Sequence, residues 1–375
     1  MQAAEKMPGK KRFRKLAVEV SVTLLVLMAA APLRAEWEKI DAGTNASLRG
    51  LSVVNVNVVW ASGTGGTVIR TVDGGKQWSV ITVPSAEKLD FRGIRAFDEN
   101  NAVIISSGEA EKGQARIYRT LDGGATWKQV FEDTRRGIFL DAIAFWNRQH
   151  GIVLSDPIEG KFVLFTTDDG GATWKQLPPA ALPAALPKEG AFAASNSCLA
   201  VQGTRNVWFA TGGAKVARVF HSADRGQTWS VAETPMHPAN DSSGIFSLYF
   251  EDSHHGSAVG GDYAHPGALL APGLLRTTDG GATWHACAGT DQPGVYLSSI
   301  ASFWGPGKDS EIALGSVGAF IGEGGSAWKK ELSENLNSLA VTSYAASGQS
   351  PIIWAVGQGG IVMRDRIHYH RGRRR

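Results

Sequence analysis

The sequence predicts an all-β fold, a seven-bladed β-propeller whose blades are four-stranded antiparallel sheets. Three observations predict it. One eight-residue motif returns at a near-regular interval, the segments between its copies are short runs of β-branched residues, and two incomplete pieces at the ends of the chain complete each other. The 375 residues, 43% of them hydrophobic, are enough to bury such a core.

The motif, called the repeated turn below, reads Thr/Ser-x-Asp-Gly/Arg-Gly-x-x-Trp. It occupies residues 71–78, 120–127, 167–174, 222–229 and 277–284, and a weaker copy, IGEGGSAW, ends at Trp328. Its acids are Asp73, Asp122, Asp169, Asp224 and Asp279, and its closing aromatics are Trp78, Trp127, Trp174, Trp229 and Trp284. Successive tryptophans stand 44 to 55 residues apart, counting Trp328. This is the length of a propeller blade, whereas helical repeats would show a 3.6-residue periodicity.

One repeat contains four strand-like runs. They read LRGLSVVNV, VVWASGTGG, TVIRTVDGG and QWSVITV between residues 48 and 83, with glycine and asparagine turns between them. We name the strands A to D from the channel outward. The repeated turn then joins strands C and D, where its aspartate can accept backbone N–H groups and its tryptophan can pack between blades. Because one active site cannot use five or six copies spread around a ring, the motif is expected to stabilise the fold.

The two ends of the repeat region predict how the ring closes. IIWAVGQGGIVMRD at 352–365 supplies strands B and C of a last blade, and EWEKI at 36–40 is a strand D without the other three. Pairing them removes both free sheet edges. Six motif copies and this composite unit give seven blades over residues 36–365.

The termini have a different composition from the body. Residues 1–35 carry KKRFRK followed by the apolar run VSVTLLVLMAAAP, which predicts a secretory signal peptide and an exported protein, periplasmic or extracellular, with no transmembrane span after cleavage. An uncleaved membrane anchor is the alternative. Residues 366–375 are expected to form a basic, disordered tail. Without both ends the net charge is about −7, so no nucleic-acid partner is expected.

Metal, cofactor and disulfide chemistry find no support in the sequence. Cys198 and Cys287 are assigned to an innermost and an outermost strand of neighbouring blades, too far apart for a bridge. The chain has no CxxC, HExxH, EF-hand or phosphate-loop sequence. We therefore expect no cofactor, no metal and no disulfide, in a monomer.

The repeated turn resembles the Asp-box, or BNR repeat, of sialidases, xyloglucanases, sortilin-type receptors and photosystem II stability and assembly factor-like proteins. The fuller pattern WAxGxGGxxxRTxDGGxxW at 60–78, echoed at 352–365, most resembles the assembly-factor-like group, and the resemblance covers nearly all of 37–365. Sialidases usually carry an Arg-Ile-Pro motif before the first box, and this chain has none. The resemblance implies a non-catalytic scaffold.

Topology predicts where a site would lie. The A–B and C–D hairpins share one face, so the D–A connections and B–C loops lie on the other. Alignment of the strand A starts gives equivalent positions at Arg49, Arg92, Asp141, Ser197, Phe246, Ser298 and Asn337. Segments 154–162, 178–195 and 259–273 are interpreted as insertions on the same face. The predicted binding residues are Arg49, Arg92, Asp141, Asp156, Glu189, Asp262 and Tyr263, with His265 nearby.

Two functions remain open at the level of sequence. The favoured one is an exported propeller that binds a protein partner or stabilises an assembly. The alternative is a sialidase- or xyloglucanase-like glycoside hydrolase acting on a glycan, which would need two carboxylates about 5 to 9.5 Å apart. Asp141, Asp156, Glu189 and Asp262 could supply such a pair, but only Trp146 and Trp304 are left as spare tryptophans to stack on a sugar.

Overall fold

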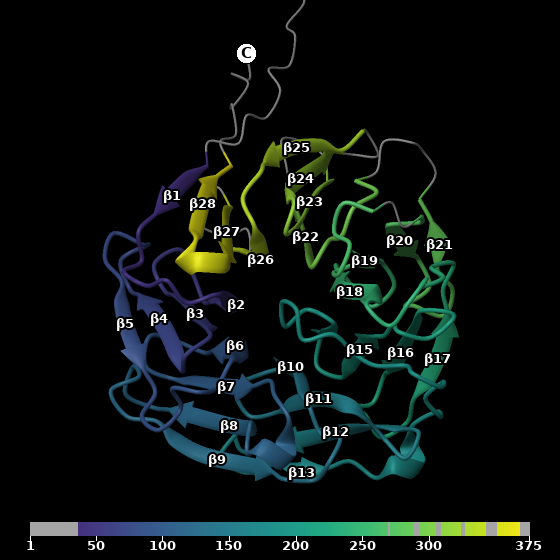
Figure 1. Cartoon of the computed structure of the whole chain (residues 1–375), viewed down its shortest axis with the longest axis horizontal. Coiled ribbons are helices and arrows are strands. Elements are labelled where there is room, and N and C mark those ends of the chain that lie inside the picture. Colours follow the sequence, from purple (N-terminus) through teal and green to yellow (C-terminus); the bar gives the residue numbers. More distant parts are fainter. Residues whose placement is uncertain are drawn as a thin grey trace, which may run out of the picture. The chain divides into compact units, whose positions relative to one another are not determined.

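Seven four-stranded antiparallel sheets are arranged in a ring around a central channel (Figure 1). The computed structural model describes residues 37–268, 271–287, 293–304, 309–323, 327–342 and 351–367. The predicted signal peptide and residues 368–375 of the predicted tail lie outside these residues, as does part of the weaker sixth motif copy. The first residue of the predicted tail, Arg366, ends a β-strand, so the tail was predicted to begin too early. The seven-bladed propeller predicted from the sequence is confirmed.

Each blade runs from an innermost strand A to an outermost strand D. Blade 1 consists of β2 (Leu48–Val53), β3 (Val59–Gly63), β4 (Thr67–Thr71) and β5 (Ser79–Thr82). Blade 2 consists of β6 (Phe91–Ala96), β7 (Ala102–Ser106), β8 (Ala115–Thr120) and β9 (Lys128–Asp133). Blade 3 consists of β10 (Leu140–Phe145), β11 (Gly151–Ile158), β12 (Lys161–Thr167) and β13 (Lys175–Gln176). Blade 4 consists of β14 (Leu199–Gln202), β15 (Asn206–Ala210), β16 (Arg218–Ser222) and β17 (Ser230–Glu233). Blade 5 consists of β18 (Ser243–Phe250), β19 (Gly256–Asp262), β20 (Leu274–Thr277) and β21 (His285–Ala286).

Blade 6 consists of β22 (Ser299–Trp304), β23 (Asp309–Gly315), β24 (Gly318–Glu323) and β25 (Lys329–Leu332). Blade 7 consists of β26 (Leu336–Val341), β27 (Ile352–Gly357), β28 (Val362–Arg366) and β1 (Glu38–Ile40). Short 3₁₀ turns are η1 (Ala110–Lys112), η2 (Pro179–Ala181) and η3 (Gln358–Gly360). No helix among the described residues is long and apolar enough to cross a membrane.

Blade 7 closes the ring with strands from both ends of the repeat region. Strand β1 pairs antiparallel with β28, with Lys39 opposite Met363, and the Glu38 carboxylate pairs with the Arg364 guanidinium at 2.5 Å. The outermost strand therefore comes from the start of the repeat region and its three neighbours from the end, as predicted. This pairing gives blade 7 the same four strands as the others.

The core lies between adjacent blades rather than inside any one of them. Trp78 at the end of a repeated turn meets Trp354 of blade 7 edge to face at 5.8 Å between ring centroids. Phe97, which follows the innermost strand of blade 2, packs edge to face on Phe145 of blade 3, at 5.0 Å between ring centroids. Aromatic edges of this kind lock neighbouring sheets together.

The hydroxyl and the carboxylate of the repeated turn bond within the turn itself, whereas the ring nitrogens of four of its tryptophans, Trp78, Trp127, Trp174 and Trp284, are buried with no partner among the described residues. In the copy at 120–127 the Thr120 hydroxyl, 1% exposed, accepts the N–H of Gly124 and donates to Asp122, both at 2.9 Å. Asp122 in turn accepts the backbone N–H of Thr126 at 2.9 Å and its hydroxyl at 2.6 Å. These donors favour the ionised carboxylate and lower the pKa of Asp122 to about 2. Such closed bonding is what a fold-stabilising turn requires.

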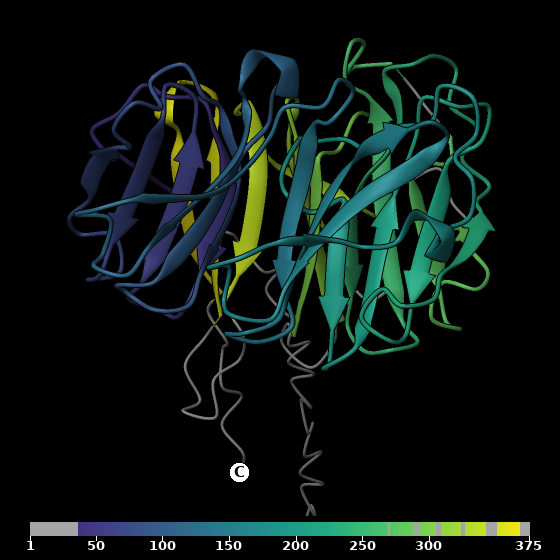
Figure 2. The ribbon, with the colours of Figure 1, turned by 90° about the horizontal axis from the view of Figure 1, so that it is seen from below.

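The repeated turns and the A–B turns lie on one face of the ring. Gly74 donates its N–H to the carbonyl of Asn57 in the A–B turn of the same blade at 2.9 Å, and Gly123 does the same with Asn100. The strands run between this face and the opposite one (Figure 2). The D–A connections and B–C loops therefore meet on the opposite face.

One predicted insertion is not a loop. Residues 154–162 belong mostly to β11 and β12, which are joined by a two-residue turn in which Glu159 and Gly160 both have positive φ, 51° and 74°. Two positive φ values in succession make the tight turn of an ordinary hairpin. Pro157 cannot donate to the ladder, and the strand accommodates it with a bulge at Asp156. The segment was wrongly interpreted as an insertion because its proline imitates a loop.

Candidate binding pocket

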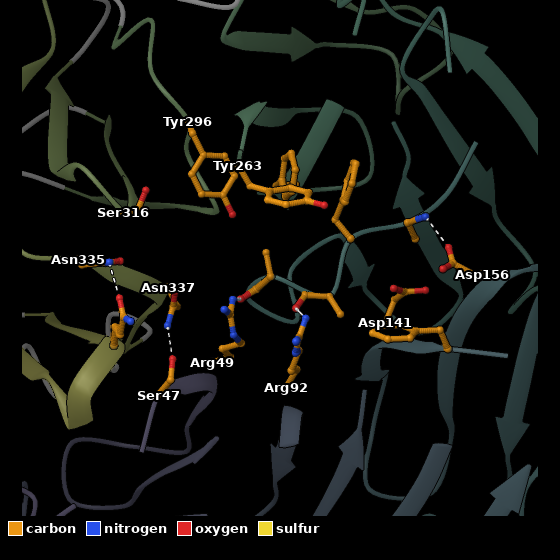
Figure 3. Close-up of a pocket in the computed structure, with 17 residues that line it drawn as sticks. Ser47, Arg49, Arg92, Asp141, Asp156, Tyr263, Tyr296, Ser316, Asn335 and Asn337 are labelled. Carbon is orange, nitrogen blue, oxygen red and sulfur yellow. Dashed lines mark hydrogen bonds between the residues drawn. The ribbon is translucent and has the colours of Figure 1, made fainter. Parts of the chain in front are cut away.

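A cavity of about 580 Å³ lies on the face opposite the repeated turns. Figure 3 shows the side chains that line it. Every residue that lines it comes from a D–A connection, a B–C loop or an adjoining strand end. They are Ser47, Arg49, Arg92, Phe139, Asp141, Asp156, Ala191, Phe192, Ala193, Ala194, Phe246, Tyr263, Tyr296, Ser316, Asn335, Asn337 and Gln358.

β-Bulges in the innermost strands direct side chains into this cavity. In blade 1, Leu48 pairs with Gly63 and Gly50 with Ser62, so Arg49 has no partner residue across the ladder. The register shifts in the same way at the equivalent position of four other blades. The extra residues are Arg49, Arg92, Asp141, Phe246 and Asn337, and all of them line the cavity. A bulge re-aims the residue that it adds, so one device repeated around the ring builds the site.

The D–A connection before β14 contacts every other blade of the ring. We call residues 190–196 the plug; it runs inside the ring (Figure 1). It bonds or packs to all the other blades through Asp156, Arg92, Arg49, Ser298, Ser338 and Phe246. Its residues Ala191 to Ala194 form part of the cavity wall. The pocket therefore has a fixed floor made by a single segment.

Two arginines form one side of the pocket. Arg92 donates from Nε to Asp90 Oδ2 at 2.7 Å and from a terminal nitrogen to the Ala193 carbonyl at 3.4 Å. Arg49 donates to the Ala194 carbonyl at 3.4 Å, and its buried Nε has no partner within the described residues. Burial, and then the charge of Arg92, lower the pKa of Arg49. Arg49 is thus a desolvated cation with donor capacity to spare.

Two carboxyl groups lie on the blade 3 side. Asp141 is 1% exposed, and its Oδ2 has no hydrogen-bond partner in the described part of the chain. Burial raises the pKa of Asp141 well above its usual range, the nearby Asp156 raises it further, and Arg92 opposes the shift. Asp156 accepts the N–H of Ala191 at 3.0 Å, and burial raises its pKa to about 6. Asp156 is itself a bulge residue, so two bulges on adjacent strands bring these groups together.

Aromatic rings form the wall contributed by the plug and blades 5 and 6. Phe192 of the plug stacks on Phe246 with ring centroids 4.0 Å apart, and Tyr296 meets Phe246 edge-on at 4.9 Å. Tyr263 lies 6.1 Å from Phe246 and is 55% exposed. Blade 7 adds amides, of which Asn337 donates to the Leu48 carbonyl at 2.8 Å. The pocket thus combines cations, carboxyls, amides and aromatic rings.

Two of the seven predicted residues do not line the pocket. Glu189 is buried within blade 4, where it forms an ion pair with Arg218 and accepts the Thr211 hydroxyl at 2.6 Å. Asp262 accepts bonds from Asn240, Ser242 and His265, and so organises the loop after β19. The pocket does bring together the other predicted residues, Arg49, Arg92, Asp141, Asp156 and Tyr263.

Sequence reasoning predicted Tyr263 and the insertion at 178–195, but it missed the other rings of the aromatic wall, Phe192, Phe246 and Tyr296, and the position of residues 190–196 inside the ring. Phe246 stood in the alignment of strand A starts but was passed over because only charged positions were chosen. Two glycines, Gly212 and Gly244, face the Phe192 ring, and a Cβ at either position would come within 2.5 or 3.0 Å of it. These glycines are the sequence feature that could have pointed to a large side chain packed against them. The spare Trp146 lies away from the pocket and donates from its ring nitrogen to the Asn206 carbonyl at 2.7 Å. The side chain of Trp304 lies outside the described structure.

Comparison with known proteins relates the fold to two kinds of propeller. No family model matches the sequence, and no curated protein matches it significantly. The chain is similar to the solved structure of YCF48 bound to D1 peptide, with a TM-score of 0.61 and 17% identity over 88% of this chain and 97% of that one. It is similar to YCF48 from Cyanidioschyzon merolae, with a TM-score of 0.61 and 16% identity over 88% and 98% of the two chains.

A glycoside hydrolase has a comparable fold. The GH74 xyloglucanase from Xanthomonas campestris matches with a TM-score of 0.58 and 16% identity, over 89% of this chain and 54% of that one. Identities this low establish a shared fold alone, so the function has to be argued from the pocket.

Proposed function

We propose that the protein is an exported, non-catalytic binding scaffold of the photosystem II stability and assembly factor-like type, which holds a protein partner in the pocket opposite the repeated turns. One observation carries the proposal: bulges in five blades turn side chains into a single cavity where Arg49 and Asp141 have buried polar atoms that no other described residue bonds to. An unsatisfied buried polar atom costs about 1–3 kcal/mol, and a ligand that bonds to it recovers this cost.

The chemistry of the pocket suits a polypeptide. Arg49 offers donors for a carbonyl or carboxylate oxygen, Asn335 and Gln358 offer amide groups, and Phe192, Phe246 and Tyr296 offer a surface for an apolar side chain. The plug and the bulges hold these groups on rigid backbone, which reduces the entropy lost on binding. The structure of YCF48 with a D1 peptide gives a precedent for peptide binding by a propeller of similar fold.

Glycoside hydrolysis is the second candidate, favoured by the raised pKa values of Asp141 and Asp156 and by the similarity to a xyloglucanase. A hydrolase needs two carboxyl groups that flank the scissile bond, one of them ionised. Here the two lie on adjacent strands of one blade, burial raises the pKa of both, and Asp156 raises the pKa of Asp141 further. No tryptophan of the described part of the chain lines the pocket for sugar stacking. These features favour the binding scaffold.

A capture experiment with matched variants tests the proposal. Wild-type protein, Arg49→Ala and Lys128→Ala would each be crosslinked in extracts of the cells that make the protein, and captured proteins quantified by mass spectrometry. Lys128 is exposed on β9, an outermost strand, so its variant controls for the loss of one positive charge. We expect one stoichiometric partner that Lys128→Ala retains and that Arg49→Ala captures about tenfold less. Hydrolysis of a glycan that Asp156→Asn abolishes would instead support the enzyme.

A further inference from the structure

Neither carboxyl group of the blade 3 pair, Asp141 and Asp156, forms an ion pair with another described residue. Arg92 is the nearest positive group to oppose the raised pKa of Asp141, but its Nε is held by Asp90 at 2.7 Å and a terminal nitrogen bonds to Ala193. Asp156 has the Ala191 N–H for one oxygen. A further titratable neighbour is the buried thiol of Cys198, whose pKa is itself raised by burial and by Asp141. Two buried carboxyl groups therefore share a site that the described residues do not neutralise.

The geometry leaves room for a cation beside this pair. Asp141 and Asp156 line the same cavity and their carboxyl groups lie toward one another on one side of it (Figure 3). The free Oδ2 of Asp141 belongs to a side chain that is 1% exposed. The ring of Phe139 lines the cavity near them and already lies 6.0 Å from the Arg92 guanidinium, as a cation–π contact requires.

We propose that Asp141 and Asp156 form a subsite for a lysine or arginine side chain of the partner. This inference rests on the proposed function, because it identifies one group of the polypeptide that the pocket would hold. A cation between the carboxyls would give Oδ2 of Asp141 its missing donor and remove their mutual repulsion. A calcium ion fits less well, since it takes 6–8 oxygen ligands and the described residues gather no group of three or more potential metal-binding side chains here.

Cation binding at this pair is linked to protons. The free protein holds protons on the carboxyls near pH 6, where Asp156 has its pKa, and a bound cation favours their ionised forms. Binding should therefore release protons and tighten as the pH rises, by about tenfold per pH unit below pH 6 for each proton released.

Capped tripeptides provide the probes. Acetyl-Gly-Lys-Gly-amide and acetyl-Gly-Arg-Gly-amide would be titrated by calorimetry in two buffers of different ionisation enthalpy, beside the matched glutamine peptide. Gly-Gly-Gly-amide with a free amino terminus separates a side-chain cation from a terminal one, and calcium chloride tests the metal. We expect the lysine or arginine peptide to bind at least tenfold tighter than the glutamine peptide, with proton release.

Variants separate the subsite from the rest of the pocket. Asp156→Asn and Asp141→Asn should each lower affinity for the basic peptide at least tenfold while leaving the protein at least as stable at pH 8, and Asp168→Asn, on an exposed carboxyl of a repeated turn, should bind like wild type. Equal binding of the glutamine peptide, tighter binding of calcium or of the free amino terminus, or unchanged affinity in Asp156→Asn would overturn the inference. Basic peptides that bind when no partner protein is captured would leave the subsite standing and remove the proposed function.

Discussion

At the scale of single residues, the repeated turn depends on a buried hydroxyl as much as on its acid. The hydroxyls of Thr71, Thr120, Thr167 and Thr277 each accept a glycine N–H at 2.9 Å and donate to the aspartate two residues later, and Ser222 does so in the fourth copy at 2.8 Å. The aspartate bonds outward to the exposed part of the turn. The two side chains therefore contribute differently to the stability of the turn. The hydroxyl satisfies a buried N–H group, and the carboxylate orders the exposed backbone of the turn.

Replacing the buried hydroxyl should be costly. Thr120→Val keeps the shape of the side chain but leaves the N–H of Gly124 without an acceptor, so the free energy of unfolding should fall by about 1–3 kcal/mol. Urea denaturation measures this, with the exposed Thr126→Val as control. Asp122→Ala should also lower stability. In neither variant should binding at the pocket change, and loss of binding with an unchanged unfolding midpoint would contradict the structural role of the turn.

The carboxyls of the pocket should lower stability as the pH rises. Their pKa values are raised in the folded protein, to about 6 for Asp156, whereas an unfolded aspartate titrates near 3.8. The stabilising effect of the protonated group is complete below pH 4 and is lost as the pH rises to about 6. Asp156→Asn does not titrate, so its advantage over wild type should grow over this interval to about 1–3 kcal/mol.

Thermal unfolding between pH 4 and pH 8 measures this advantage, with Asp168→Asn as the control for loss of a negative charge. A difference between Asp156→Asn and wild type that stays constant, or that narrows as the pH rises, would show that Asp156 is not a desolvated carboxyl. A gain in stability from removing pocket residues is the pattern expected when a site is maintained for binding.

At the scale of elements, the plug determines whether a pocket exists. The segment that leads into the plug is held by Glu189, whose carboxylate accepts hydrogen bonds from Arg218 and Thr211 inside blade 4. Glu189→Ala would leave the guanidinium of Arg218 buried and unpaired, so we expect a loss of about 3–5 kcal/mol in the free energy of unfolding. The double variant Glu189→Gln/Arg218→Met should recover much of that loss, as chemical denaturation can measure. Failure of the single variant to destabilise would mean that the plug is held by its other contacts alone.

The strands and their order in the ring could be predicted from the sequence, whereas the β-bulges that form the pocket could not. Period, strand pattern and ring closure were predictable because each blade repeats the same local chemistry, and β1 was assigned to blade 7 from its lack of partners. The bulges were not predictable from the sequence, because a bulge is a mismatch in residue number between two paired strands and neither strand alone carries a residue pattern that marks it. Arg49, Arg92 and Asp141 were nevertheless chosen correctly as pocket-lining residues, because equivalent positions in a repeat occupy equivalent places. Glu189 was misplaced because its partner Arg218 is remote in sequence.

At the scale of the whole molecule, one face of the ring carries the turns that stabilise the fold and the other face carries the candidate binding pocket. One carries the repeated turns, whose hydroxyl and carboxylate groups bond within each turn, and the other carries a cavity in which ionisable side chains, Arg49 and Asp141, have buried polar atoms with no partner among the described residues. A partner that completes those bonds should dock on the second face. Propellers separate scaffold from site in this way, since loops at one end of a rigid ring can vary without disturbing its core.

Hydrogen–deuterium exchange of the protein with and without its captured partner tests this account most directly. We predict that binding slows exchange in the plug, residues 190–196, and in the pocket loops around Tyr263 and Asn335. Exchange in the repeated turns at 71–78 and 120–127 should not change. Protection confined to the repeated turns, with the plug and the pocket loops exchanging as in the free protein, would contradict the assignment of the binding face.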